Sequence, residues 1–336
     1  MTALLLILVP LIGGLVTFFV KQESQAKLWS FVVSLVTLAA MSVNLLMNDE
    51  AGRSFTAEWL PQLGSSFALQ MDGASTLLCF LTALSYPIIF ASTWKSSYAS
   101  PNSFYGLMLL AQAGITGVFL AADGLLFYFF WELALIPVYF LCSKWGGEKR
   151  IAVTFKFFIY TFIGSLLMLV GLLYMYYQTA DASFSMQSLY AVKLSAEQQS
   201  WLFWLFFIAF AVKMPVFPFH TWQPDTYEQS PTAVTMVLSA LMVKMGLFAV
   251  IRWLLPLFPD AAVQYDNVVI GLSVIGMIYA SILAMQQDDI KRLIAYSSIA
   301  HIGLMAAALF VRNESGLQGA MIQLFSHGGN VLGMWI

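Results

Sequence analysis

Two apolar stretches decide the fold of this chain: WLFWLFFIAFAVKMPVFPFH at residues 201–220 and TAVTMVLSALMVKMGLFAVI at residues 232–251. Both are long enough to cross a bilayer as a helix, yet each contains one lysine, Lys213 in the first and Lys244 in the second. A lysine deep in a membrane-spanning helix costs at least about 2.5–3.5 kcal/mol on insertion scales, so it indicates a functional site by default. Two such lysines predict an ion pathway within the membrane.

The first stretch also carries the signal for a broken helix. Pro215 and Pro218 follow Lys213, and proline lacks the N–H that a continuing helix needs. Broken backbone at membrane depth persists only where protein or a water-filled cavity satisfies its polar groups. We therefore predict a helix break at Pro215 and Pro218, beside a pathway that carries protons.

The composition is that of a polytopic membrane protein. Of the 336 residues, 60% are hydrophobic and 10% are charged, against roughly 45–50% and 25% in soluble domains. The net charge of −2 comes with no basic patch for nucleic acid, and the chain has neither a GxGxxG nor a P-loop motif for a nucleotide. Cys79 and Cys142 lie in apolar runs without a CxxC motif, so we predict two small buried side chains and no metal or redox centre.

Apolar segments recur along the whole chain, and we predict an all-α bundle of about 11 membrane spans. They cover residues 2–20, 28–47, 76–94, 105–121, 125–143, 155–177, 201–220, 232–251, 268–285, 293–311 and 317–336. Two longer polar segments, at residues 48–72 and 178–199, and the connection TWQPDTYEQSPT at residues 221–232 separate some of these spans. The first span has its lysines after it rather than before it, so we expect a retained helix and not a cleaved signal peptide.

Lysine and arginine in the loops predict the orientation. If the spans alternate, one face collects eight of them: Lys21, Lys27, Lys95, Lys144, Lys149, Arg150, Lys291 and Arg292. The other face collects four: Arg53, Lys193, Arg252 and Arg312. The richer face is expected to be cytoplasmic, which places the N-terminus outside.

Glu132 is the acidic candidate for the pathway. It lies inside the span LLFYFFWELALIPVYFLC, five residues before Pro137. A carboxylate without a partner in a low dielectric takes up a proton, because desolvation disfavours its charged form. If Glu132 approaches Lys213 each keeps the other charged, and if they separate a proton can pass. The alternative is a static ion pair that only locks two helices together.

Three basic residues extend the pattern into later spans. Lys244 has no acidic partner in its own span and can exchange a proton, the alternative being a side chain that reaches the membrane surface. His301 and His327 can pass a proton between their ring nitrogens, although a lone histidine is often only a satisfied hydrogen-bonding residue. We expect His220 near the membrane interface and Lys156 as a topology or snorkelling charge.

The predicted proton pathway therefore contains one residue in each of five spans: Glu132, Lys213, Lys244, His301 and His327. No two of them have the spacing of metal ligands on one helix. We predict no catalytic residue and no metal site in the chain itself. An intramembrane enzyme that uses one of the histidines as a base is disfavoured, because no acidic or nucleophilic partner lies at a recognisable spacing.

Several motifs resemble the antiporter-like subunits of respiratory complex I. They are FFWELALIPVYFL (residues 129–141), KFFIYT (156–161), VKMPVFPFHTWQPDTYEQSPT (212–232), DDIKRLIAYSSIAHIG (288–303) and LFSHG (324–328). The first of them is most similar to subunit M, called chain 4 in mitochondria. The resemblance covers most of the chain from about residue 105 onward, and the WELxLIP motif and the proline-bearing segment are its specific parts.

The resemblance implies inverted five-helix repeats, each with a broken helix. We expect N-terminal spans at residues 1–104, a first repeat at 105–255 and an incomplete second repeat at 264–336. It also implies that Glu132 pairs with Lys213, that Lys244 bridges the halves, and that His301 and His327 continue a polar axis.

The function implied is proton translocation driven by quinone reduction elsewhere in an NADH:quinone oxidoreductase. NADH, flavin, iron–sulfur clusters and quinone would then be bound by other subunits, and no soluble small molecule by this one. The expected partners are antiporter-like neighbours and the lipid of a bacterial inner (plasma) membrane.

Two further points stay open in the sequence. The family has about 14 spans, so the end of this chain in its eleventh span suggests a truncated or partial chain. The alternatives to complex I are a subunit of a multisubunit Na⁺/H⁺ antiporter or of a membrane-bound hydrogenase, and a truncated scaffold that does not conduct.

Overall fold

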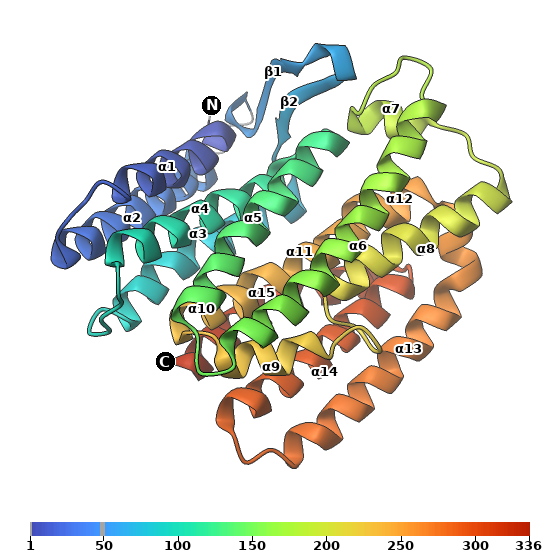
Figure 1. The fold of residues 1–336 in the computed structure, drawn as a ribbon. Coiled ribbons are helices and arrows are strands. Elements are labelled where there is room, and N and C mark those ends of the chain that lie inside the picture. Colours follow the sequence, from blue (N-terminus) through green and yellow to red (C-terminus); the bar gives the residue numbers. More distant parts are fainter. Residues whose placement is uncertain (1, 48–50) are drawn as a thin grey trace.

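The computed structural model describes residues 2–47 and 51–336, so residues 48–50 of the predicted polar segment 48–72 lie outside the described part. The chain forms a bundle of long helices that run back and forth between two ends of the molecule (Figure 1). The long helices are α1 (Thr2–Thr17), α2 (Glu23–Met47), α3 (Gly73–Ser92), α4 (Pro101–Leu120), α5 (Gly124–Trp145), α6 (Arg150–Gln178), α8 (Ala196–Lys213), α13 (Pro259–Met285), α14 (Ile290–Phe310) and α15 (Glu314–Trp335).

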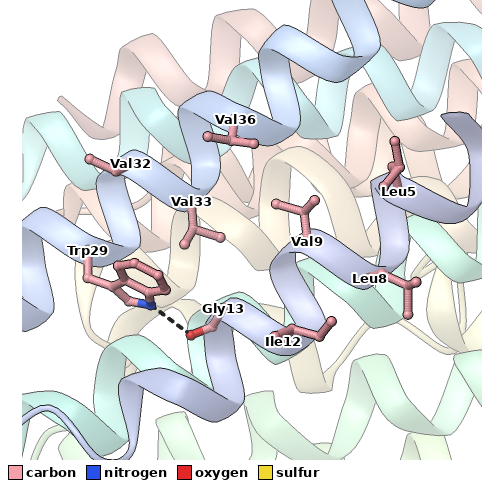
Figure 2. Close-up of a pocket in the computed structure, with 9 residues that line it drawn as sticks. All are labelled: Leu5, Leu8, Val9, Ile12, Gly13, Trp29, Val32, Val33 and Val36. Carbon is pink, nitrogen blue, oxygen red and sulfur yellow. Dashed lines mark hydrogen bonds between the residues drawn. The ribbon is translucent and has the colours of Figure 1, made fainter.

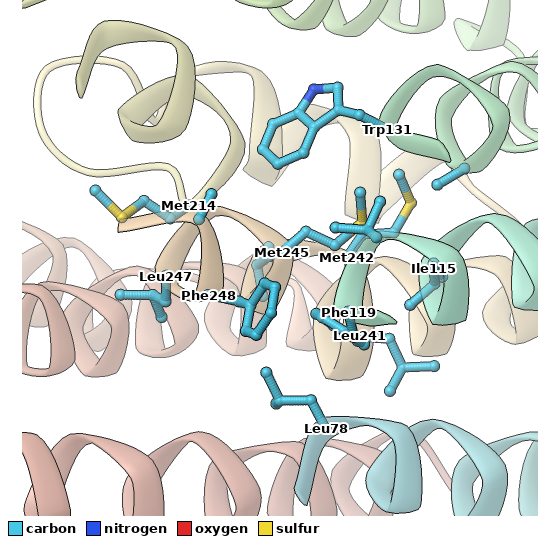
Figure 3. Close-up of a cluster of buried hydrophobic side chains, with 14 of the residues drawn as sticks. Leu78, Ile115, Phe119, Trp131, Met214, Leu241, Met242, Met245, Leu247 and Phe248 are labelled. Atoms are coloured by element: carbon cyan, nitrogen blue, oxygen red, sulfur yellow. The ribbon is translucent and has the colours of Figure 1, made fainter. Parts of the chain in front are cut away.

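One further rod, at residues 232–257, changes its helix type along its length. It consists of α10 (Thr232–Val237), η3 (Leu238–Met242), α11 (Val243–Ala249), η4 (Val250–Leu254) and α12 (Leu255–Leu257), in which η3 and η4 are π-helical. Nearly all of its residues are buried, and it lies at the centre of the bundle (Figure 1). Its apolar neighbours come from several helices, and Figure 3 shows Leu78 of α3, Phe119 of α4 and Trp131 of α5 around it.

Eight helices in the described part are long and apolar enough to cross a membrane. They cover residues 23–46, 73–92, 101–120, 124–145, 150–178, 232–257, 259–285 and 290–310. Such segments fold as helices because lipid offers no hydrogen-bonding partner to the backbone. In a helix, the backbone N–H and C=O groups pair within the segment. The chain is therefore a mostly helical, multi-pass membrane protein.

A β-hairpin marks one end of the bundle, which we call the hairpin end. Strand β1 (Ser54–Leu60) pairs antiparallel with β2 (Ser65–Gln70). The short 3₁₀ segments η1 (Ala51–Arg53) and η2 (Pro61–Leu63) precede the two strands. Gly64 ends the turn with φ of 63°, and a Cβ there would lie 1.8 Å from the carbonyl oxygen of Ala182, so only glycine fits this turn.

Asp123 holds the hairpin against the bundle. Its Oδ1 accepts hydrogen bonds from the Ser65 hydroxyl at 2.8 Å and from the N–H groups of Leu125 and Leu126 at 3.0 Å each. Its Oδ2 accepts from the N–H of Ser66 at 3.1 Å. One carboxylate therefore caps the N-terminus of α5 and fixes the second strand.

The opposite end gathers lysine-bearing loops, and we call it the lysine-rich end. Trp145 donates its indole N–H to the carbonyl of Ala99 at 2.6 Å, and the Asn102 amide donates to the carbonyl of Phe18 at 2.9 Å. The N–H of Gly147 donates to the carbonyl of Gln229 at 2.7 Å. The loops after α1, α3 and α5 and the end of α9 are thus neighbours.

Three connections contain regular structure that the sequence did not indicate. The hairpin departs from an all-α chain, and it lies in the polar segment at residues 48–72. The connection at residues 221–232 contains a short helix, α9 (Trp222–Gln229), and the segment at residues 178–199 contains α7 (Met186–Ala191). Pro224 did not prevent α9 because it lies in the first turn, where a missing N–H costs nothing.

Helices α1 and α2 lie side by side at one edge of the bundle (Figure 1). Figure 2 shows the groove between them, about 430 Å³ in volume, with Leu8, Ile12 and Val36 among its aliphatic lining residues. The indole N–H of Trp29 donates to the carbonyl of Gly13 at 3.0 Å. The groove therefore exposes hydrocarbon, as expected of a surface in contact with lipid.

Candidate functional site

The break after α8 lies directly beside Lys213, which is the last residue of that helix. Pro215 cannot donate to the carbonyl of Ala211, and the N–H of Val216 does so instead at 3.0 Å. The carbonyl of Val212 accepts the indole N–H of Trp222 at 2.9 Å. The broken end of α8 is thus satisfied by protein groups, as buried backbone must be.

The central rod packs closely against this break. A Cβ on Gly246 in α11 would lie 2.8 Å from both the backbone N of Met214 and the carbonyl oxygen of Phe210. Met214 belongs to the same buried cluster as Met245 and Leu247 of the rod (Figure 3). The absence of a side chain at Gly246 therefore lets α11 contact the backbone at the end of α8.

Lys213 is buried without a hydrogen-bonding partner. Its side chain is 2% exposed, its Nζ makes no hydrogen bond, and it lies 5.4 Å from the ring centroid of Trp131. An ammonium at this distance from an indole is stabilised by the negative face of the ring. Buried charge is costly unless it is paired, and the Trp131 ring is the stabilising contact that the structure gives Lys213.

Glu132 is the acidic group that acts on Lys213. The two charges interact electrostatically, and the Ser165 hydroxyl lies beside the Glu132 carboxylate. However, none of the ion pairs in the described part of the chain joins them. Oε1 of Glu132 is buried and makes no hydrogen bond. In this structure the two groups are therefore near each other but separated.

Lys244 is fully buried in α11 and contacts a residue 83 positions away. Its Nζ lies 2.8 Å from Nδ1 of His327 in α15, and it donates to the carbonyl of Ser239 at 2.6 Å. Ser239 belongs to the π-helical segment η3, and such segments widen a helix and often occur at functional sites. The Ser239 hydroxyl accepts the indole N–H of Trp335 at 3.0 Å.

His301 connects to this pair from the outer face of α14. Its ring centroid lies 5.5 Å from that of His327, and its Nδ1 lies 3.4 Å from the amide nitrogen of Gln323. His327 is 2% exposed, whereas His301 is exposed. His301 therefore lies at the surface of the described bundle, unlike Lys244 and His327.

The structure brings the five predicted residues together in two groups. Lys244, His327 and His301 form one continuous group, and Glu132 and Lys213 form the other. No hydrogen bond in the described part of the chain connects the two groups directly. Sequence reasoning missed Trp131, Trp222 and Ser239, whose roles depend on contacts between helices. Only Trp131 had a local signal, its position next to Glu132.

Two residues expected outside the pathway lie close to the break. His220 is 4% exposed, its Nδ1 makes no hydrogen bond, and its ring lies against those of Phe217 and Tyr279. Lys156, expected as a topology or snorkelling charge, also makes specific contacts within the protein. Its Nζ pairs with Asp225 at 2.8 Å and donates to the carbonyl of Thr221 at 2.8 Å. Both residues therefore help to fix the segment between α8 and α9.

Comparison with known proteins identifies a family and individual relatives of this chain. Residues 121–334 match the family described as NADH:quinone oxidoreductase/Mrp antiporter, transmembrane. The chain is 38% identical to F(420)H(2) dehydrogenase subunit M of Methanosarcina mazei over 97% of its length and 68% of that protein. It is 36% identical to NADH-quinone oxidoreductase subunit M of Escherichia coli K12, over 98% of this chain and 69% of that one.

Solved structures share the fold. A chain of respiratory complex I from Thermus thermophilus with bound NADH superposes with a TM-score of 0.92 at 28% identity, over 100% of this chain and 70% of that one. The membrane-bound sulfane sulfur reductase, an archaeal respiratory complex, gives a TM-score of 0.90 at 24% identity, over 99% and 69% of the two chains, and shows the fold alone. By its family match and its relatives, this chain belongs to the NADH:quinone oxidoreductase/Mrp antiporter family of transmembrane proteins.

Proposed function

We propose that this chain is a proton-translocating membrane subunit of an NADH:quinone oxidoreductase, and that quinone reduction elsewhere in the complex drives proton transfer along its buried residues. The relatives named subunit M support this function. The structural neighbour from respiratory complex I supports assembly beside other antiporter-like membrane subunits.

The observation that carries the proposal is the environment of Lys213. Its ammonium is enclosed by protein at the end of a broken helix and makes no hydrogen bond, and the carboxylate that acts on it is not in contact. Small movements of Glu132 towards or away from Lys213 change the electrostatic energy strongly, because the interaction is weakly screened inside the protein. Approach favours a charged Lys213, and separation favours release of its proton.

The second group receives or supplies that proton. Nζ of Lys244 and Nδ1 of His327 are 2.8 Å apart, so a proton can move between them without a change in the fold. His301 offers the next ring at 5.5 Å between centroids. No hydrogen bond in the described part of the chain joins Lys213 to Lys244, so the proposed transfer between them requires bridging water.

The proposal includes the finer architecture predicted from the sequence. It comprises about eleven spans and an N-terminus outside a bacterial inner membrane. The N-terminal spans cover residues 1–104, and the inverted five-helix repeats cover residues 105–255 and, incompletely, 264–336. The antiparallel course of the helices between the hairpin end and the lysine-rich end supports this arrangement. The lysine-rich end would then face the cytoplasm.

The test is Lys213→Ala in the assembled complex, studied in inverted membrane vesicles. We expect loss of proton translocation and lower coupled quinone reduction, with unchanged amounts of assembled complex. The matched control is Lys193→Ala, since Lys193 is exposed in the connection between α7 and α8. An unchanged number of protons per electron in the Lys213→Ala variant would refute the proposal.

The same vesicles separate the alternatives. A Na⁺/H⁺ antiporter subunit predicts translocation that requires Na⁺ and proceeds without a quinone substrate. A scaffold that does not conduct predicts that Lys213→Ala and Glu132→Gln lower the amount of complex and leave translocation per complex unchanged.

A further inference from the structure

We propose that Trp222 is a positioning residue for Lys213, acting through one hydrogen bond to the broken end of α8. This inference rests on the proposed function, because it concerns the residue that the function depends on. Nothing in the sequence motif assigns this role to Trp222. It follows from the contact between the side chain of α9 and the backbone of α8.

The hydrogen bond satisfies a carbonyl that the break would otherwise leave free. The indole N–H of Trp222 donates to the carbonyl of Val212 at 2.9 Å, and Val212 immediately precedes Lys213. A helix end leaves its last carbonyls without intrahelical partners. Here the end lies inside the bundle, so a free carbonyl would pull the last turn towards water or another donor.

Trp222 is itself held firmly. Its side chain is 1% exposed, and its ring packs against Phe157 of α6 with the centroids 4.9 Å apart. The Thr226 hydroxyl donates to the carbonyl of Trp222 at 2.6 Å. The indole is therefore enclosed by protein, with its N–H directed at the Val212 carbonyl.

Ion pairs at the lysine-rich end hold the N-terminal part of α9. Lys156 of α6 contacts both the Thr221 carbonyl and Asp225, at 2.8 Å each. The Tyr160 hydroxyl lies 2.9 Å from the Thr221 hydroxyl. The residue before Trp222 is thus anchored to α6 by side chains on two successive turns.

The C-terminal part of α9 is held by α14. Arg292 pairs with Asp225 at 3.1 Å and with Glu228 at 2.8 Å. Lys291 donates to the carbonyls of Glu228 and Ser230 at 3.4 and 3.3 Å. A cation at these carbonyls also stabilises the C-terminal end of the helix dipole. Helix α9 is therefore a short rigid element that presents Trp222 to the end of α8.

The position of the Lys213 side chain depends on the backbone of α8, because few polar groups surround its Nζ. Its Nζ makes no hydrogen bond, and among the described titratable groups Glu132 of α5 is the one whose charge acts on it. Its position relative to Glu132 and Trp131 is then set by the backbone of the last turn of α8. Removing the hydrogen bond to Val212 frees that turn and changes the electrostatic energy of the ammonium.

The test is Trp222→Phe, which keeps an aromatic ring against Phe157 and removes the N–H. The matched control is Trp253→Phe, because Trp253 is equally buried and its indole N–H has no partner. The readout is the pH profile of proton translocation in inverted membrane vesicles, normalised to assembled complex. The shape of this profile does not depend on how much complex is present, so a loss of stability alone would not move it.

We expect Trp222→Phe to lower translocation per complex about fivefold or more, as for a buried acceptor left unsatisfied, and to displace the pH of half-maximal rate. Trp253→Phe should leave translocation per complex within twofold of that of the unsubstituted chain. It should also leave the pH of half-maximal rate unchanged. Benzothienylalanine at position 222, which replaces only the N–H by sulfur, should reproduce the effect of phenylalanine.

A profile of Trp222→Phe that coincides with that of the unsubstituted chain, or an equal displacement by Trp253→Phe, would overturn the positioning role. Lys213→Ala distinguishes this failure from failure of the proposed function. If Lys213→Ala abolishes translocation while Trp222→Phe has no effect, only the role of Trp222 is lost.

Discussion

Nζ of Lys244 lies 2.8 Å from Nδ1 of His327, and the two side chains come from helices that are far apart in the sequence. A contact this short needs a lone pair on one of the nitrogens. If Lys244 is an ammonium, His327 must be neutral with its proton on Nε2; if His327 is an imidazolium, Lys244 must be a neutral amine. No ion pair in the described part of the chain gives Lys244 a carboxylate partner. The two groups are therefore not both charged, and a single extra proton would be shared between their nitrogens.

The first prediction concerns this shared proton. His327→Ala removes the second base and leaves Lys244 with the Ser239 carbonyl alone. We expect proton translocation to fall about a hundredfold, the usual effect of losing a positioned proton-transfer group. The measurement is proton translocation in inverted membrane vesicles. The control is Asn330→Ala, on the exposed side of the same helix. Near-normal translocation in the His327 variant would exclude its place in the pathway.

The second prediction concerns Glu132. Glu132→Gln keeps the volume of the side chain and removes the negative charge that acts on Lys213. We expect translocation to be lost while the complex still assembles, because the approach of an amide no longer stabilises a charged Lys213. The control is Glu148→Gln in the exposed loop before α6. Assembly that falls in parallel with translocation would instead support a static helix-locking role.

The third prediction concerns the close contact between α11 and the break. Gly246→Ala places a Cβ 2.8 Å from backbone atoms of Met214 and Phe210, and overpacking of this kind costs about 1–3 kcal/mol. We expect a lower thermal stability of the purified complex. Gly271→Ala in α13 is the control, because no atom lies within 4 Å of its Cβ. Equal melting temperatures for the two variants would contradict the tight packing at Gly246.

The fourth prediction concerns the hairpin end. Asp123→Ala removes the acceptor for four hydrogen bonds, including the cap of α5, and loss of a helix cap costs about 0.5–2 kcal/mol. Hydrogen exchange should therefore accelerate in residues 54–70. Asp123→Asn keeps one acceptor oxygen and should accelerate exchange less. If exchange in residues 54–70 is unchanged in Asp123→Ala, the carboxylate does not hold the hairpin.

Much of this molecule could be predicted from local sequence. The apolar runs indicate the long helices, because each segment can satisfy its own backbone only as a helix. Pro215 placed the end of α8 beside Lys213, since the missing N–H acts within one turn. The buried lysines were identifiable for the same local reason, as single charges inside apolar segments.

The contacts between helices were decided by the tertiary structure. The rod that carries Lys244 is mostly apolar and nearly all of its residues are buried, so its sequence does not show which face meets α15. The pairing with His327, the exposure of His301 and the hydrogen bond from Trp222 to Val212 all depend on how helices rotate and pack. Between apolar helices that rotation is set by the fit of small and large side chains across the interface, which no single segment contains.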